Sequence, residues 1–212
     1  SMNVPFDWTY GRYNNVEATR QQIRELGPEL AAVIFEPMTG SGGCIPATAE
    51  FVAMIREETE RAGALMIMDE VMTSRLSPGG LHGLWGATPD LVSFGKYLGG
   101  GLTFGAFGGR ADIMNRFDPS KPGAFAHAGT FNNNVLSLSA AIAGLSKVYT
   151  PEAAARLNGD GETLRGRLNV ALKGARVAGQ VTGIGSMMMV HLTDKPLTGP
   201  TDADEVAPTL RG

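Results

Sequence analysis

ALMIMDEV (residues 64–71) and LVSFGKYLGGG (residues 91–101) are the two stretches that decide the fold. Each contains a short apolar run of the kind that forms a strand covered on both faces in a parallel sheet. A polar residue closes each run: Asp69 follows the first, and Lys96 follows the second, ahead of three glycines. Ligands of open α/β sheets bind beyond the carboxyl ends of the strands, so we expect Asp69 and Lys96 to reach a shared crevice.

Lys96 is a candidate nucleophile. Desolvation in a crevice lowers the pKa of a lysine amine and makes it reactive towards an aldehyde. Taken alone, a lysine is usually a solvated surface residue, because lysine is seldom buried without a partner. Asp69 also has a structural alternative, as a strand-end cap or a salt-bridge partner.

Helix and strand signals alternate through the first half of the chain. Asn15 can cap a helix over residues 16–26, and a strand is expected at residues 31–37. A second helix, capped by Thr48 and ended by Gly63, leads into the first quoted stretch. This β-α-β order predicts a parallel pair of strands joined by a right-handed crossover.

The second half continues the alternation. The expected elements are strands at residues 91–96 and 103–109, helices at residues 131–150 and 152–178, and one or two strands at residues 179–193. The second of these helices is expected to be interrupted near Gly159 and Gly161. Residues 193–212 have little apolar periodicity and are expected to form a loop or a frayed end.

Composition excludes several classes of protein. The chain has 212 residues, 43% of them hydrophobic, and a net charge of -3, which is typical of a globular protein with a real core. It has no basic surplus for nucleic acid and no apolar run of 18 residues for a membrane span. The single cysteine, Cys44, excludes an internal disulfide and fits a reducing compartment. With no secretory leader in view, we expect a cytoplasmic protein.

Five motifs in order carry a family resemblance. They are EPMTGSGG (36–43), MDEVMTSR (68–75), SFGKYLGGG (93–101), GAFGGR (105–110) and HAGTFNNN (127–134). The series resembles a class III aminotransferase, and within that class it is most similar to the glutamate-1-semialdehyde 2,1-aminomutase group. The resemblance implies an α/β chain forming the large-domain part of the fold type I transferase fold, with a mostly parallel sheet flanked by helices. It also implies pyridoxal 5'-phosphate (PLP) as the cofactor.

The resemblance runs over about residues 4–193, but members of the family are much longer. The segment that cradles the cofactor phosphate and the aromatic residue that stacks on its ring are expected upstream. We therefore expect a chain truncated at both ends. Residues 1–180 are expected to be part of the PLP-binding large domain, and residues 181–212 the start of the C-terminal small domain or a disordered end.

The family pattern assigns roles to three residues. Lys96 corresponds to the lysine that forms a Schiff base with PLP and then shuttles a proton on the substrate, which is general acid and base work. Asp69 corresponds to the carboxylate that keeps the pyridine nitrogen protonated. At about 4 Å and an effective dielectric of about 20, such a pair is worth about 4 kcal/mol, or roughly three pKa units. Val71, two residues further along the expected strand, resembles the residue packed on the ring face, and it also suits a plain core position.

Thr130 matches the threonine that donates to the cofactor phosphate from the neighbouring subunit, which implies a homodimer with the site at its interface. The alternative is a helix cap, because threonine serves both uses. Gly129 would allow close approach of the backbone.

Glu36 and Ser41 are further candidates in the motif at residues 36–43. Glu36 has a possible substrate role, and a structural carboxylate that bonds the backbone or an arginine is an equal alternative. Ser41 stands where many ω-aminotransferases have a glutamate, which favours the aminomutase group. Arg75 is shifted relative to the arginine of that group, so its partner is expected to differ.

These assignments imply an aminotransferase or a 2,1-aminomutase that acts on a small amino acid or amine. A decarboxylase or racemase of the same class would use the same lysine and aspartate. A non-catalytic fragment that serves only as a folded or assembly domain is the alternative of a different kind. His82, His127 and His191 lack metal-ligand spacing, so no metal site is expected.

Overall fold

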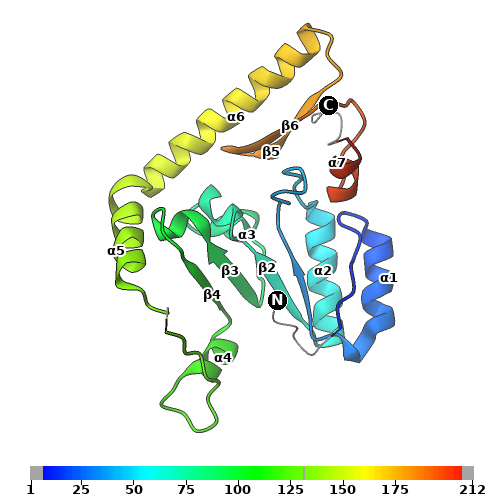
Figure 1. Cartoon of the computed structure of the whole chain (residues 1–212). Coiled ribbons are helices and arrows are strands. Elements are labelled where there is room, and N and C mark those ends of the chain that lie inside the picture. Colours follow the sequence, from blue (N-terminus) through cyan, green and yellow to red (C-terminus); the bar gives the residue numbers. More distant parts are fainter. Residues whose placement is uncertain (1–6, 131, 207–212) are drawn as a thin grey trace.

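The centre of the fold is a four-stranded sheet with the spatial order β1-β2-β3-β4 (Figure 1). The structure is a computed structural model that describes residues 7–130 and 132–206. The strands are β1 (Ala32–Phe35), β2 (Leu65–Asp69), β3 (Leu91–Gly95) and β4 (Gly105–Gly109). The first three are parallel and β4 is antiparallel to β3, which confirms the mostly parallel sheet.

Helices α1 (Val16–Leu26) and α2 (Ala49–Ala62) begin at the predicted caps. The side chain of Asn15 accepts a hydrogen bond from the Ala18 N–H, and that of Thr48 accepts one from the Phe51 N–H. Gly63 ends α2 at a φ of 71°, in the left-handed region that glycine adopts without steric cost. The β-α-β unit is therefore confirmed in its elements and in its parallel pairing.

The helices cover one face of the sheet, as Figure 1 shows for α1 and α2. Met66 and Met68 of β2 are fully buried and pack with Phe51 and Ile55 of α2. Ile34 of β1, in contrast, is 49% exposed. Because successive side chains of a strand point to opposite faces, Asp69 projects away from the face that α2 covers.

A buried carboxylate joins the two helices. Glu58 of α2 is fully buried and accepts hydrogen bonds from Arg20 and Arg24 of α1, and it also pairs with Arg61. The hydrogen bonds from Arg24 hold the pKa of Glu58 below its ordinary value, against the opposing effect of burial. The negative charge of Glu58 is thus compensated by arginines of both helices, and it links α1 to α2.

The remaining elements follow the sheet. They are α3 (Gly80–Trp85), α4 (Ala111–Met114), α5 (Val135–Ala143), a π-helical turn (Gly144–Val148), α6 (Pro151–Gly174), the hairpin β5 (Gln180–Ile184) and β6 (Met187–His191), and α7 (Pro200–Val206). None of the helices in the described part of the chain has the length and apolar composition that a bilayer crossing requires.

Three predictions about this half were wrong. The helix expected over residues 131–150 begins at Val135, because the side chain of Asn134 accepts from the Ser137 N–H and caps it there. Helix α6 runs without a break through Gly159 and Gly161. A Cβ on Gly161 would lie 2.3 Å from the Gly185 carbonyl oxygen, so this glycine permits close packing of the hairpin on α6.

The third wrong prediction concerns the end of the chain, where a loop or frayed end was expected. Residues 200–206 form α7, with Asp202 accepting hydrogen bonds from the N–H groups of Thr198 and Gly199. Ala203 of this helix is buried. Residues 207–212 lie outside the described part of the chain.

Candidate functional site

Three ionisable residues lie where the parallel strands end. Glu36 follows β1, Asp69 is the last residue of β2, and Lys96 follows β3. Phe35 pairs with Met68 and Asp69 with Ser93 in the strand register, so the three carboxyl ends lie at one edge of the sheet. This edge is where open α/β sheets bind their ligands.

Asp69 is held through one of its two oxygens. Its Oδ1 accepts hydrogen bonds from the Val71 N–H at 3.0 Å and from the Ser93 hydroxyl at 2.9 Å. Among the described residues, no group donates to Oδ2. The carboxylate is therefore fixed in place and keeps one oxygen free to accept a proton donor. Ser93 was not among the expected site residues, although a lone serine inside an apolar strand was a usable signal.

Lys96 has an exposed side chain and an unusual backbone. Its φ is +51°, in the left-handed region, and it opens a 3₁₀ turn (Lys96–Gly99) that ends at Gly100. For a residue other than glycine such a conformation costs about 1–3 kcal/mol and is found most often at functional sites. The strain accompanies the turn that brings the chain out of β3 at the ligand-binding edge.

Glu36 is bound to the loop that follows it. Its Oε2 accepts the Gly40 N–H at 2.8 Å, and its carbonyl accepts the Tyr13 hydroxyl at 2.8 Å. Burial raises the pKa of Glu36 and the charge of Asp69 adds to the rise, while the Gly40 hydrogen bond and the charge of Lys96 oppose it. The backbone contact fits the structural alternative for Glu36.

Replacing Glu36 by glutamine should raise the free energy of unfolding, relative to the wild-type protein, more at neutral pH than in acid. A carboxyl group whose pKa is raised on folding favours the folded state at low pH, and this contribution is lost as the pH rises through the folded-state pKa. Glutamine keeps an acceptor for the Gly40 N–H and carries no charge. Urea unfolding of both proteins at about pH 4 and about pH 7 measures the difference. An equal difference at both pH values would contradict the expectation.

Val71 lies in a turn, because β2 ends at Asp69 and not at Val71 as predicted. Glu70 and Val71 leave the strand when the chain bends into a 3₁₀ turn (Thr73–Leu76). A Cβ on Gly95 would lie 3.3 Å from the Val71 Cγ1, so the Val71 side chain packs beside the residue that precedes Lys96. Val71 therefore borders the same edge as Asp69 and Lys96.

Thr130, Gly129 and Ser41 are not joined to this group of residues. Gly129 and Thr130 are exposed in a turn in which the Asn132 N–H donates to the Gly129 carbonyl, and Ser41 is exposed in the loop after β1. Within residues 7–130 and 132–206, no hydrogen bond or ion pair links them to Asp69 or Lys96. Thr130 does not cap α5 either, because Asn134 does.

Arg75 has an aromatic partner. Its guanidinium lies over the ring of Tyr149, 5.8 Å from the centroid, and its carbonyl accepts the Tyr149 hydroxyl at 2.7 Å. The Tyr149 ring also contacts Tyr97, the residue after Lys96, with centroids 5.3 Å apart. This stack connects the turn after β2 to the turn after β3, and no local sequence pattern predicted it.

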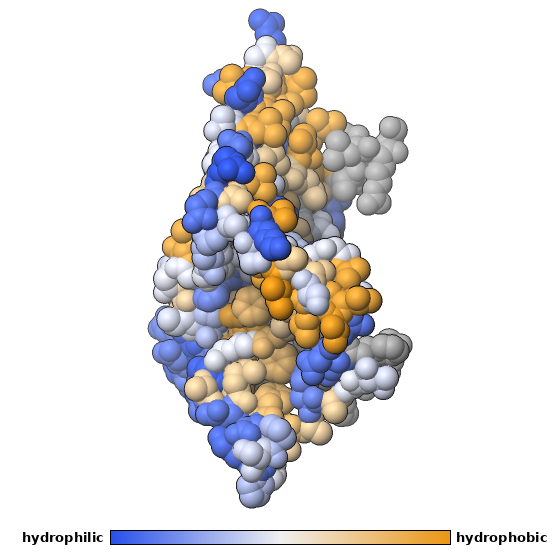
Figure 2. Space-filling view, turned by 90° about the vertical axis from the view of Figure 1, so that its left-hand side faces the viewer, coloured by the Kyte–Doolittle hydropathy of each residue, from blue (hydrophilic) through white to orange (hydrophobic). Residues whose placement is uncertain are grey.

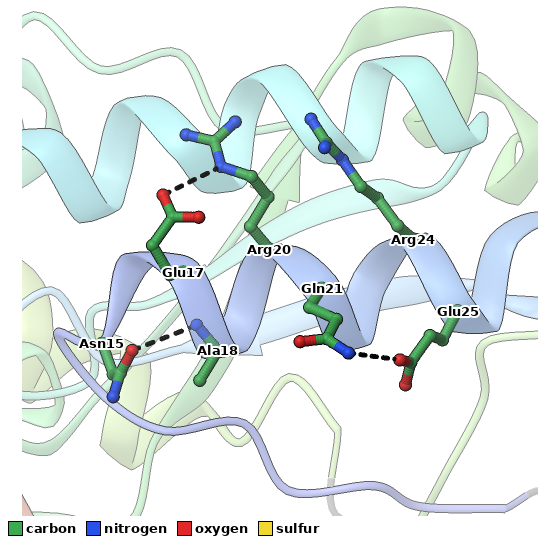
Figure 3. Close-up of a pocket in the computed structure, with 7 residues that line it drawn as sticks. All are labelled: Asn15, Glu17, Ala18, Arg20, Gln21, Arg24 and Glu25. Atoms are coloured by element: carbon green, nitrogen blue, oxygen red, sulfur yellow. Dashed lines mark hydrogen bonds and ion pairs between the residues drawn. The ribbon is translucent and has the colours of Figure 1, made fainter.

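A shallow hollow along α1, beside α2, lies away from the strand ends (Figure 3). Its lining residues are Asn15, Glu17, Ala18, Arg20, Gln21, Arg24 and Glu25. Figure 3 shows Arg20 paired with Glu17, and Gln21 donating to Glu25. The charged side chains of this surface thus form ion pairs or hydrogen bonds with one another and with Glu58. In the described part of the chain, no group of three His, Cys, Asp or Glu side chains is placed to hold a metal ion.

Comparisons with known proteins cover nearly the whole chain. Residues 7–207 match the family model Aminotransferase class-III. A beta-phenylalanine transaminase from Variovorax paradoxus is 50% identical over 208 residues, which are 98% of this chain and 48% of that protein. A crystal structure of a beta-phenylalanine aminotransferase from the same organism has a TM-score of 0.93, at the same identity and coverage.

More distant relatives show the same partial coverage. A glutamate-1-semialdehyde 2,1-aminomutase from Pyrobaculum aerophilum is 43% identical over 201 residues, which are 91% of this chain and 45% of that protein. A solved structure of a transaminase with PLP bound is 34% identical and has a TM-score of 0.82. The match covers 93% of this chain and 46% of that protein. The chain therefore spans about half the length of the curated relatives that it matches.

Proposed function

Because this chain belongs to the class III aminotransferase family and has the expected fold of the type I PLP-dependent transferases, we propose that the protein transfers amino groups with PLP bound at Lys96. The observation that carries the proposal is the position of Lys96 and Asp69 at the ends of adjacent parallel strands, at one edge of the sheet. A lysine amine and a carboxylate are the two groups that PLP chemistry requires of the protein here.

The residues at this edge fit the cofactor. The Lys96 side chain is exposed and can reach an aldehyde, and Asp69 has an oxygen with no donor among the described residues. Val71, whose side chain packs beside Gly95, would supply an apolar surface next to Lys96. When bound, PLP supplies an electron-withdrawing ring that takes up the electrons released at the substrate carbon.

Each residue then has a defined task. Asp69 would hold the proton on the pyridine nitrogen, an interaction worth about 4 kcal/mol at about 4 Å and an effective dielectric of about 20. Lys96 would bind the aldehyde of the cofactor and afterwards move a proton to or from the substrate carbon. Thr130 and Gly129 would serve the phosphate from a neighbouring subunit, which is consistent with their exposure and their separation from Asp69 and Lys96.

A β-amino acid related to β-phenylalanine is the first substrate to test, because the relative with 50% identity is a beta-phenylalanine transaminase. Aminomutase activity on an amino aldehyde is the second candidate. It is supported by the relative with 43% identity and by Ser41 at the position where many ω-aminotransferases have a glutamate.

The proposal includes a homodimer and a cytoplasmic location. Helix α5 and the π-helical turn expose the apolar residues Val135, Leu136, Ile142 and Val148, each at least 69% exposed. Figure 2 shows apolar side chains gathered on the face that carries these elements. A second copy of the protein would remove this surface from water. The unpaired thiol of Cys44 supports a reducing compartment.

Covalent labelling tests the proposal. The purified chain is incubated with PLP and borohydride, and the modified peptide is identified by mass spectrometry. We expect a visible absorbance band that borohydride removes, with the added mass on Lys96. A chain that stays colourless at saturating PLP, or that is labelled equally on exposed lysines such as Lys121 and Lys147, would support the alternative of a non-catalytic domain.

A further inference from the structure

Glu70 is a fully buried carboxylate that directly follows Asp69. Its Oε2 accepts hydrogen bonds from the Leu81 N–H at 2.7 Å and the Thr73 hydroxyl at 3.1 Å. Its Oε1 accepts the His82 N–H at 2.7 Å and contacts the His82 Nδ1 at 2.5 Å. A carboxylate can only accept, so the Nδ1 of His82 is the protonated nitrogen in this contact. Both oxygens of Glu70 are therefore saturated with donors.

These bonds tie the end of β2 to the start of α3. Leu81 and His82 belong to the first turn of α3, and Thr73 opens the 3₁₀ turn between them and the strand. Gly80, at a φ of 72°, lets the helix start approach, since a Cβ there would lie 2.9 Å from the Glu70 Oε2. The turn that follows Asp69 is thus anchored from inside the protein.

The backbone of Glu70 is fixed as well. Its N–H donates to the Ser93 carbonyl of β3 at 3.1 Å, just beyond the end of β2, and its carbonyl accepts the Ser74 N–H at 3.1 Å. The next residue, Val71, donates its N–H to Asp69 Oδ1 and packs its side chain beside Gly95. The place of Val71 therefore depends on the path that Glu70 imposes on the turn.

We infer that Glu70 is a positioning residue, which together with His82 holds the turn after β2 so that Val71 keeps its hydrogen bond to Asp69. The importance of this role for catalysis rests on the proposed function of Asp69 and Val71. The contacts themselves are independent of any cofactor. No other carboxylate in the described part of the chain is both fully buried and adjacent in sequence to a residue of the strand-end group.

Glutamine at position 70 has the same shape but cannot satisfy the same donors. Each oxygen of Glu70 faces a backbone N–H, so an amide NH₂ in either place would oppose a donor with a donor. The matched control is Glu58→Gln. Glu58 is also fully buried and saturated by hydrogen bonds, but it joins α1 to α2.

Hydrogen exchange measured by NMR separates positioning from general stability. In Glu70→Gln we expect the exchange rate of the Val71 amide to rise about tenfold relative to that of the Ile55 amide of α2. A tenfold rise corresponds to a loss of about 1.4 kcal/mol in the local free energy that protects the amide. In Glu58→Gln the Val71 amide should not exchange faster relative to the Ile55 amide, because Glu58 belongs to α2 and its loss acts on that helix. Equal changes in Glu70→Gln would overturn the inference and leave Glu70 a purely structural residue.

His82→Ala keeps the experiment decisive if Glu70→Gln does not fold. It removes only the ring contact to Glu70 Oε1 and should accelerate Val71 exchange in the same direction by a smaller factor. Unchanged Val71 exchange in His82→Ala would overturn the inference, because the role is assigned to Glu70 together with His82. Because these measurements use the chain without PLP, failure of the proposed function shows separately, as absence of the visible band in the wild-type protein.

Discussion

The Lys96→Ala protein should remain folded, show no visible absorbance with PLP, and carry no borohydride-fixed label at position 96. The exposed Lys96 side chain makes no hydrogen bond or ion pair with the described residues, so its removal costs the fold little. Alanine meets the same left-handed backbone conformation as lysine, so the strain at this position is unchanged. Only the amine that binds the aldehyde is lost.

Lys173→Ala is the control for this experiment, because Lys173 is also exposed and lies in the last turn of α6, outside the strand-end group and the proposed subunit interface. It should bind PLP like the wild-type protein. Absorbance titration with PLP and unfolding in urea, carried out on all three proteins, give the comparison. Retention of the band in Lys96→Ala would show that another amine binds the cofactor and would refute the assignment of Lys96.

The Asp69→Asn protein should keep the visible band but transfer amino groups about a thousandfold more slowly. Removing a charge interaction of about 4 kcal/mol lowers the pKa of the pyridine nitrogen by roughly three units and weakens the electron-accepting ring accordingly. Asparagine still offers an oxygen to the Val71 N–H and the Ser93 hydroxyl, so the position of the side chain is kept.

The rate is measured as the loss of the visible band when an amine donor is added to the PLP-loaded protein. Ser93→Ala removes one hydrogen bond to Asp69 without removing the charge, and its rate should fall far less. If Asp69→Asn and Ser93→Ala slow the reaction equally, Asp69 acts through its hydrogen bonds and not through its charge.

Local signals predicted the first half of the fold well. The caps Asn15 and Thr48, and Gly63 at the end of α2, act within four residues of their own positions. The apolar runs likewise predicted strands β2 and β3, but the expected cover on both faces was wrong for the described residues: Met66, Met68 and Val92 are buried, and the apolar residues next to them are only partly buried. Such features appear in the sequence because the groups that satisfy each other are neighbours in the chain.

The predictions that were wrong depend on partners far away. Gly159 and Gly161 favour an interruption locally, and α6 nevertheless continues, because Gly161 packs against Gly185 of the hairpin. Val71 was predicted to lie in a strand, but the bonds that Glu70 makes to Leu81 and His82, 11 and 12 residues away, draw the chain out of the sheet after Asp69.

The sequence by itself determined that Asp69 and Lys96 stand at the ends of two apolar strands, and its motifs identified the family. Only the tertiary structure decided how these residues are held: Asp69 by Ser93 and Val71, and the turn beyond it by the buried Glu70. The physical reason is the range of the interactions. Strand ends follow from local composition, whereas a saturated buried carboxylate needs donors that come together only when the chain has folded.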